Sequence, residues 1–395
     1  MNRLMRTYPE PPVTFVRGQG SWLWDDAGRR YLDFLSGLAV TSLGHAHPVV
    51  ADAICAQART LLHVSNLFGT QPGPEVAATL DRLLGGGGRV FFANSGAEAN
   101  ECAIKLARKW GRSRRRTSGA AAGGRYAVVS TYGSFHGRTL ATLHATGQPA
   151  KHQGFGPMPE GFRHVAWADL DDLAAAIDPS VAAVLVEAVQ GEGGVIPATA
   201  AYLAGVRELC DQAGVLMMVD EVQTGLGRTG AWFAHQHWLA GDRGSGPDVV
   251  TMAKALGNGM PIGACWAAEE VADAFEPGDH ATTFGGQPLA AAAARATLGV
   301  MEAEDVPTRA AAMGQRLAAG LERLPGVAGV RGMGLLVAAA LEEEKAGPVA
   351  AAALDAGLVV NAVTPGALRL APSLLVSAAE VDEAVDIVGR VLAGT

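Results

Sequence analysis

The amino-acid sequence predicts an α/β protein with a mostly parallel central sheet covered by helices and a smaller α+β domain. The chain has 395 residues, of which 49% are hydrophobic and 18% charged, which is enough for the cores of two domains. Through its middle, short valine-rich runs alternate with helical patterns, as in a parallel sheet with crossover helices. After Pro288 the pattern changes to long alanine-rich helices with few strands.

The predicted strands of the central sheet are almost continuously apolar, which is typical of a sheet buried on both faces. We expect them at residues 89–92, 126–130, 181–189, 215–219, 248–251 and 263–267. Apolar residues recur at helical spacing between them, at 97–110 and 200–213. Later helices are expected at 289–304, 308–324 and 378–392.

This pattern predicts three segments. Residues 1–45 form an N-terminal segment that packs with the small domain, residues 46–287 form the large domain, and residues 288–395 form the small C-terminal α+β domain. Lengths and periods do not fix the order of the strands.

Charge and composition exclude several classes of function. The net charge of −8 opposes a general affinity for nucleic acid phosphates, and we interpret the basic run at 108–116 as a solvated loop after a helix. The apolar runs are too short for a membrane span, and residues 1–12 lack a signal-peptide stretch. Cysteines and histidines lack disulfide or metal-ligand spacing. We therefore expect a cytoplasmic protein without metal, nucleic acid or membrane partners.

A reactive amine would have to come from one of five lysines. Lys254 differs from the other four because it directly follows the predicted strand at 248–251 and precedes a turn-rich segment at 257–261. At the end of a buried strand, desolvation would lower the pKa of its amine and leave a neutral nucleophile. On Lys254 alone, however, an ordinary solvent-facing lysine is the favoured interpretation.

Two acids, Asp220 and Glu221, follow the predicted strand at 215–219, at the edge where open α/β sheets bind ligands. Magnesium-dependent nucleotide hydrolysis would need a GxxxxGK[ST] loop, but no lysine here follows a glycine. Residues 225–230 match the GxGxxG pattern of dinucleotide sites, yet an aromatic, histidine-containing segment follows instead of an Ala/Val-rich helix. The third interpretation is that Asp220 keeps the ring nitrogen of a bound heterocycle protonated, so that the ring acts as an electron sink.

That interpretation needs a phosphate site, and the segment 94–98 (NSGAE) offers one between a predicted strand and a predicted helix. Free backbone N–H groups, the positive end of the helix dipole and the Ser95 hydroxyl would converge on one anion. Ser95 and Glu98 also have the S-x-x-E spacing of a plain capping box. Both interpretations stay open.

Together these residues resemble those of the fold-type I pyridoxal-phosphate enzymes, and within them the class III (ω-amino acid) aminotransferases. The similarity is most specific in VDEVQTGLGR at 219–228 and PDVVTMAKA at 247–255. It extends over nearly the whole chain, through GLAVTSLGHAHP at 37–48, NSGAE at 94–98, FHGRT at 135–139, EAVQGEGG at 187–194, TTFGG at 282–286 and LRLAPSL at 368–374. HVSNLFG at 63–69, together with FHGRT, is most similar to the acetylornithine aminotransferases of arginine biosynthesis.

The resemblance implies pyridoxal 5′-phosphate as the cofactor, bound in the large domain. Lys254 would bind it covalently and, once released, move the proton between the substrate carbon and the cofactor carbon. Asp220 would face the ring nitrogen and Gln223 the ring hydroxyl oxygen. Phe135 would stack on the ring, with His136 beside it.

The phosphate would be bound by three consecutive residues, Ser95, Gly96 and Ala97. In this family Thr283 reaches the phosphate of the neighbouring subunit's cofactor. The resemblance therefore implies a homodimer with shared active sites.

Two arginines are expected to hold the substrate carboxylates. Arg138 would bind the carboxylate far from the reacting carbon, and Arg369 the α-carboxylate of glutamate. Glu192, which resembles the family's gating glutamate, would pair with Arg369 when no α-carboxylate is present. Thr282 is assigned to the substrate by the same resemblance.

The implied reaction is the transamination of N2-acetylornithine with 2-oxoglutarate, which gives N-acetylglutamate 5-semialdehyde and glutamate. Relatives that use ornithine, succinylornithine, 4-aminobutyrate or a lysine-pathway donor share almost every motif. Two alternatives come from other classes of protein. One is a nicotinamide oxidoreductase that uses Gly225 to Gly230, and the other is a non-catalytic protein that keeps the fold.

Overall fold

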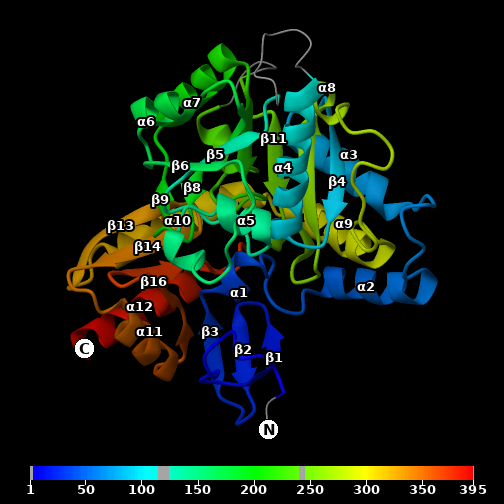
Figure 1. Ribbon diagram of the computed structural model, residues 1–395. Helices are drawn as coiled ribbons and strands as arrows, with labels where there is room; N and C mark the ends of the chain where they lie inside the picture. The colour runs from blue at the N-terminus through cyan, green and yellow to red at the C-terminus, as the bar shows by residue number, and fades with distance from the viewer. Residues whose placement is uncertain (1–2, 114–123, 240–244, 395) are drawn as a thin grey trace.

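The computed structural model describes residues 3–113, 124–239 and 245–394 (Figure 1). Within these ranges the largest sheet has seven strands in the order β4-β12-β11-β10-β7-β5-β6. Their bounds are β4 (Gly88–Ala93), β5 (Ala127–Thr131), β6 (Phe162–Val165), β7 (Val181–Glu187), β10 (Leu216–Asp220), β11 (Val249–Met252) and β12 (Gly263–Ala268). β12 runs antiparallel to β11 and β4, and the pairings from β11 to β6 are parallel. The predicted, mostly parallel sheet is confirmed.

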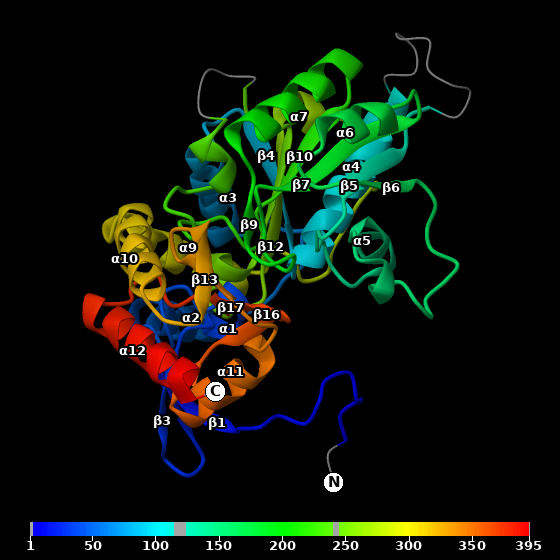
Figure 2. The ribbon, with the colours of Figure 1, turned by 90° about the vertical axis from the view of Figure 1, so that its left-hand side faces the viewer.

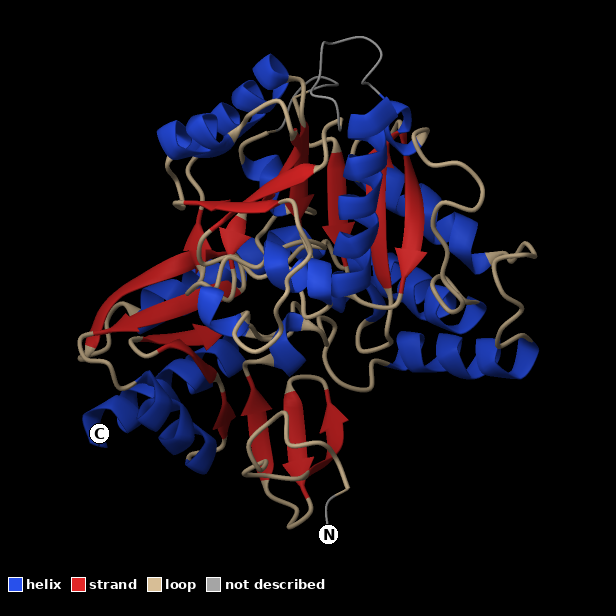
Figure 3. Cartoon of the chain, viewed as in Figure 1, coloured by secondary structure: helices blue, strands red, loops and turns tan. Residues whose placement is uncertain are grey.

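Helices cover both faces of this sheet, which explains why its strands are apolar throughout. Leu185 and Met218 pack on one face with residues of α4 (Gly96–Ser113). Val184 and Met217, one position away, pack on the other face with residues of α7 (Ala200–Ala213). In Figure 3 helices (blue) lie in front of and around the strands of this sheet (red). Successive strand residues thus enter different cores.

The other helical elements frame this sheet. They are α1 (Ser36–Ala39), α2 (Pro48–Thr60), α3 (Pro72–Leu83), α5 (Leu140–Ala145), α6 (Leu170–Ala176), α8 (Glu269–Ala272), α9 (Pro288–Ala303), and the short 3₁₀ helices η2 (Pro149–Lys151), η3 (Ala234–His237) and η4 (Lys254–Gly257). A small hairpin of β8 (Val189–Gln190) and β9 (Ile196–Pro197) follows β7, so the single strand predicted at 181–189 is wrong. The chain turns after Glu187 into a segment that carries Glu192.

The C-terminal part is built on a second sheet, in the order β13-β14-β17-β16. Its strands are β13 (Val327–Met333), β14 (Leu336–Leu341), β16 (Asn361–Thr364) and β17 (Ala367–Leu370). The helices α10 (Val306–Leu321) and α11 (Ala346–Asp355) pack on it, and α12 (Ala378–Gly394) packs against these two helices. Figure 2 shows this layer below the central sheet. The predicted smaller α+β unit is therefore present.

The N-terminal segment forms a third sheet with the C-terminal part of the chain. Its strands are β1 (Phe15–Gln19), β2 (Trp22–Asp25), β3 (Arg30–Asp33) and β15 (Leu358–Val359). β15 pairs in parallel with β3, and the amide of Phe34 donates to the Val359 carbonyl at 2.9 Å. The division at residues 45 and 287 stays a prediction. The solvated loop predicted at 108–116 is wrong for residues 108–113, which form the last part of α4, and residues 114–116 lie outside the described residues.

We predict that Gly314→Ala in α10 destabilises the protein. A Cβ at Gly314 would stand 1.9 Å from the carbonyl oxygen of Gly334, so the helix and the turn before β14 would have to separate. We expect the free energy of unfolding to fall by about 1–3 kcal/mol, as for other overpacked cores. The measurement is chemical unfolding of the purified protein.

Gly299→Ala in α9 is the matched control. A Cβ there meets no atom within 4 Å, and alanine has the higher helix propensity. We expect a gain of about 1 kcal/mol or less. Equal losses for both variants would contradict the packing of α10 against Gly334.

Candidate active site

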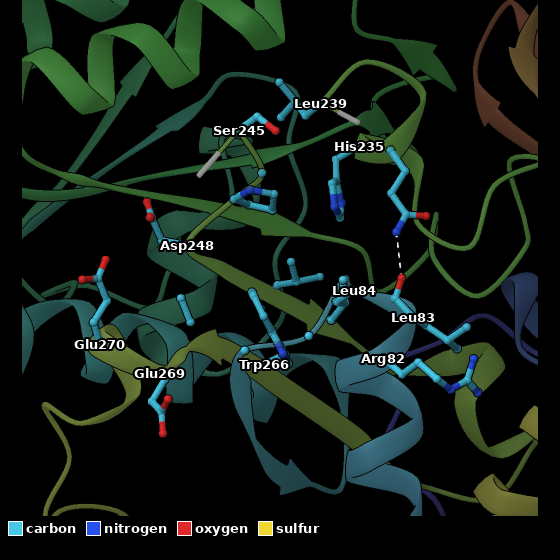
Figure 4. Close-up of a pocket in the computed structure, with 18 of the residues that line it drawn as sticks. Arg82, Leu83, Leu84, His235, Leu239, Ser245, Asp248, Trp266, Glu269 and Glu270 are labelled. Carbon is cyan, nitrogen blue, oxygen red and sulfur yellow. Dashed lines mark hydrogen bonds between the residues drawn. The ribbon is translucent and has the colours of Figure 1, made fainter. Parts of the chain in front are cut away.

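Two cavities lie at opposite edges of the central sheet. The larger, about 960 Å³, is at the edge where β11 begins and is lined by residues that include Asp248, Trp266 and Glu269 (Figure 4). The smaller, about 370 Å³, is at the edge where β10 and β11 end, and Asp220 and Lys254 line it. Because the carboxyl ends of parallel strands are where such sheets bind ligands, the smaller cavity is the candidate active site.

Lys254 lies directly after β11 and begins η4, with a backbone φ of 38°. Non-glycine residues adopt such φ values rarely, and functional sites are where this strain concentrates. Burial lowers the pKa of its amine to about 8, and Arg369 adds to the shift, although Glu192 and Asp220 oppose it. An amine with this pKa is partly neutral near pH 8, as a nucleophile or base requires.

Asp220 ends β10 with its carboxylate almost fully buried. Asn100 of α4 donates to its Oδ2 at 2.7 Å, and Nδ1 of His136 lies 2.8 Å from the same oxygen. Thr251 fixes the amide of Asn100 by donating to its Oδ1 at 2.7 Å. The amide of Val222 donates to the other carboxylate oxygen at 3.0 Å. The acid is thus held rigidly at the base of the cavity.

Asn100 was missed by the sequence reasoning, although a buried asparagine amid the apolar face of α4 is a visible signal. Glu187 begins the motif at 187–194, but the sequence assigned it no role in the site. Burial and the nearby Asp220 raise its pKa well above the ordinary value, while it accepts from the amides of Phe135 at 3.1 Å and Gly191 at 3.3 Å. Glu187 thereby fixes the loop that carries Phe135.

The segment predicted to bind phosphate lines the same cavity, with Ser95, Gly96 and Ala97 at the start of α4. Ser95 Oγ accepts from the amide of Glu98 at 3.2 Å, and Glu98 in turn accepts from the amide of Asn94 at 2.6 Å. Ser95 therefore caps the helix, but the box is not the regular one, because Glu98 bonds the amide of Asn94 instead of that of Ser95. These contacts leave the helix start open to the cavity, where it can also bind an anion.

An ion pair stands at the side of the cavity that faces the small domain. Nη1 of Arg369, on β17, lies 2.5 Å from Oε1 of Glu192. Arg369 also donates to Gln223 at 3.2 Å and to Asn361 at 3.1 Å, and its Nη2 is buried with no partner among the described residues. Burial disfavours the charged form of Glu192, but Arg369 outweighs this and lowers the pKa.

Phe135 and Arg138 both line the cavity, and the Arg138 guanidinium lies 5.6 Å from the centre of the Phe135 ring. Arg369 stands behind the lining and reaches it through Glu192 and Gln223, which do line it.

The two predicted threonines stand outside the cavity of their own chain. Thr282 contacts the cavity residue Asn94 at 3.5 Å, and Thr283 is exposed. The assignment of Thr283 to a neighbouring subunit's cofactor stays a prediction.

The glycine-rich segment after Gln223 does not form a dinucleotide site. It is a run of turns that the short 3₁₀ helix η3 follows in place of a long α-helix, and the Arg228 within it is fully buried against the small domain. Glu221, the second predicted acid, is buried and accepts from the backbone amides of Ala234 at 3.0 Å and His235 at 2.8 Å. Glu221 therefore stabilises this loop. The α-helix that a nicotinamide site needs after its GxGxxG pattern is replaced by η3.

The donor set fits pyridoxal 5′-phosphate. A rigid carboxylate for a ring nitrogen, an α-helix start with a hydroxyl for a phosphate, and a desolvated amine all face one cavity of about 370 Å³. The orphaned Nη2 of Arg369 is a free donor for a carboxylate. Fold and site together define a pyridoxal-phosphate-dependent transferase.

The chain belongs to the class III aminotransferase family, whose model matches residues 4–392. It is 46% identical to the acetylornithine aminotransferase of Corynebacterium efficiens, over 99% of this chain and 95% of that protein. It is 47% identical to the acetylornithine aminotransferase of Gloeobacter violaceus, over 99% of this chain and 96% of that protein.

Solved structures of aminotransferases have the same fold as this chain. The ornithine aminotransferase from Toxoplasma gondii superposes with a TM-score of 0.91 at 33% identity, over 99% of this chain and 93% of that one. The N-acetylornithine aminotransferase from Stenotrophomonas maltophilia has a TM-score of 0.82 at 37% identity, over 98% of this chain and 97% of that one. The predicted fold, enzyme class and cofactor are confirmed.

We predict that the Lys254 amine of the cofactor-free protein titrates near pH 8, because burial disfavours its charged form. Trace acetylation as a function of pH, followed by peptide mass spectrometry, measures the neutral fraction. The rate at Lys254 should be half-maximal near pH 8 in the folded protein and near pH ~10 in denaturant, where the ordinary lysine pKa applies. Half-maximal labelling at the same high pH in both states would contradict the buried amine.

Proposed function

We propose that the enzyme transaminates N2-acetylornithine with 2-oxoglutarate, giving N-acetylglutamate 5-semialdehyde and glutamate, as a step of arginine biosynthesis. The observation that carries the proposal is the Glu192–Arg369 ion pair beside the Lys254 amine. A donor whose reacting end carries no carboxylate needs this arginine neutralised, whereas glutamate needs it free. The acetylornithine aminotransferases that share 46–47% of their residues with this chain support the same substrates.

When bound, the cofactor supplies an electron sink for the negative charge that develops at the substrate carbon. Lys254 Nζ, uncharged in part near pH 8, would accept the proton from that carbon and donate it to the carbon of the bound cofactor. Asp220, fixed by Asn100, places its carboxyl group where a ring nitrogen would be held protonated. Phe135, fixed through Glu187, provides a flat apolar wall for stacking.

The two arginines divide the substrate carboxylates. Arg138, which lines the cavity beside Phe135, binds the carboxylate far from the reacting carbon in both substrates. Arg369 binds the α-carboxylate of glutamate with the pair of donors on its guanidinium, one of which is now held by Glu192. The side chain of Glu192 is partly exposed and can swing aside, which makes the pair a gate.

A homodimer is part of the proposal. Leu67 and Phe68 are 87% and 69% exposed, and the neighbouring Phe284 is 59% exposed. Asn66 joins these two segments by donating to the carbonyls of Thr282 at 3.2 Å and Gly285 at 3.1 Å. Clusters of exposed apolar side chains mark interaction surfaces. We propose that a second copy covers this surface, next to which the exposed Thr283 lies.

We also propose a cytoplasmic location. All four cysteines are free thiols, as is usual in a reducing compartment. Separately, the described residues contain no helix of sufficient length and apolarity to cross a membrane.

An amino-donor panel with 2-oxoglutarate tests the proposal. We expect N2-acetylornithine to give the highest kcat/KM, at least tenfold above ornithine, succinylornithine, 4-aminobutyrate and lysine. Glutamate formation by the purified enzyme, with the inactive Lys254→Ala protein as blank, is the measurement. A higher kcat/KM for another donor would replace the substrate while leaving the aminotransferase class intact.

The gate makes a separate prediction. Glu192→Ala frees Arg369 and should raise reactivity with α-amino acids relative to the ω-amine donor. Arg369→Lys should slow the 2-oxoglutarate half-reaction about tenfold or more, because lysine cannot replace a bidentate contact, and Arg138→Lys should slow both halves. Single-turnover rates of each half-reaction are the measurement. Equal losses in both halves for Arg369→Lys would refute its assignment.

A further inference from the structure

Lys151 stands beside the candidate site without lining its cavity. It ends the short helix η2, and its side chain is half-buried. Its Nζ donates to Oε1 of Gln148, whose amide nitrogen donates to the Ser134 carbonyl at 3.0 Å. Through Gln148, the ammonium group is therefore tied to the loop that carries Phe135.

Lys151 and Arg138 approach the same aromatic ring. The Lys151 ammonium and the Arg138 guanidinium each lie 5.6 Å from the centre of the Phe135 ring. Attraction to the ring face helps to hold each cation in place. Two cations from different segments of the chain are thus fixed around one side chain of the cavity wall.

These two cations lack an anion. Neither Lys151 nor Arg138 forms an ion pair with a carboxylate of the described residues, and Glu192, whose charge acts on Lys151, is already paired with Arg369. Burial lowers the pKa of Lys151, and repulsion from Arg138 lowers it further. A bound anion would relieve this repulsion. An unpaired cluster of this kind at the side of a cavity is suited to a carboxylate.

We propose that Lys151 is a specificity-determining residue that forms, with Arg138, a two-cation clamp for the substrate carboxylate far from the reacting carbon. This inference adds a substrate-binding residue to the proposed function, and it rests on that function because the proposed substrates place a carboxylate at this position. Arg138 supplies a planar pair of donors, and Lys151 adds a compact charge from the other segment. The clamp favours dicarboxylates and carboxylate-bearing donors over simple amines.

Binding of glutarate to the holoenzyme tests the clamp without any reaction, because this dicarboxylate has no amine or keto group. The variants are Lys151→Met, which removes the charge, and Lys151→Arg, which keeps it. Lys345→Met is the matched control, since Lys345 pairs with Glu343 at 3.7 Å on the small domain. Neutral glutaramide is the matched ligand without charge.

For Lys151→Met we expect two constants to rise about tenfold, the Kd for glutarate and the KM for the keto acid substrate, with kcat changed less than about threefold. Lys151→Arg should stay within about threefold of the wild type, and Lys345→Met should match it. Unchanged glutarate binding in Lys151→Met, an equal loss for glutaramide, or no measurable binding of glutarate to the wild type would overturn the clamp. The donor panel tests the proposed function separately, because it uses the wild-type enzyme alone and does not depend on Lys151.

Discussion

The burial of one amine is the constraint on which the rest of the site depends. Lys254 leaves the sheet at the end of β11 in a backbone conformation that few non-glycine residues adopt, and burial brings its pKa down to about 8. Carboxylates close by, Asp220 and Glu192 among them, limit how far that pKa falls. The parallel strands account for the arrangement, because β10 and β11 end at the same edge and deliver the acid and the amine side by side.

A second buried cation fixes the small domain against this edge. Arg228 is fully buried, which lowers its pKa to about 9, and it donates to the carbonyls of Leu335 at 3.1 Å and Pro372 at 2.6 Å. Pro372 follows β17 by two residues, so the same contact positions the strand that carries Arg369. The distance from Glu192 to Arg369 thus depends on a residue that never reaches the cavity.

The sequence allowed the residues with local signals to be predicted, and the structure supplies those that depend on tertiary contacts. The apolar strands and Lys254 could be found because their signals lie within a few residues of chain. The position of Asn100 among apolar residues is a local signal, but its role could not be predicted, because its partners Asp220 and Thr251 are more than a hundred residues away. The hairpin after Glu187 was missed because Glu187 is the one charged residue in an otherwise apolar run, Val181 to Val189, and apolar residues continue on both sides of it. The parallel pairing of β3 with β15 likewise has no signal in either segment.

The central claim is that Lys254 carries the cofactor, and borohydride reduction of the holoenzyme tests it most directly. Reduction followed by peptide mass spectrometry should place the mass of the reduced cofactor on Lys254, with complete loss of the visible absorbance and of activity. Lys254→Ala protein treated in the same way should carry no adduct. An adduct on one of the other four lysines, or a colourless protein that gives none, would contradict the account.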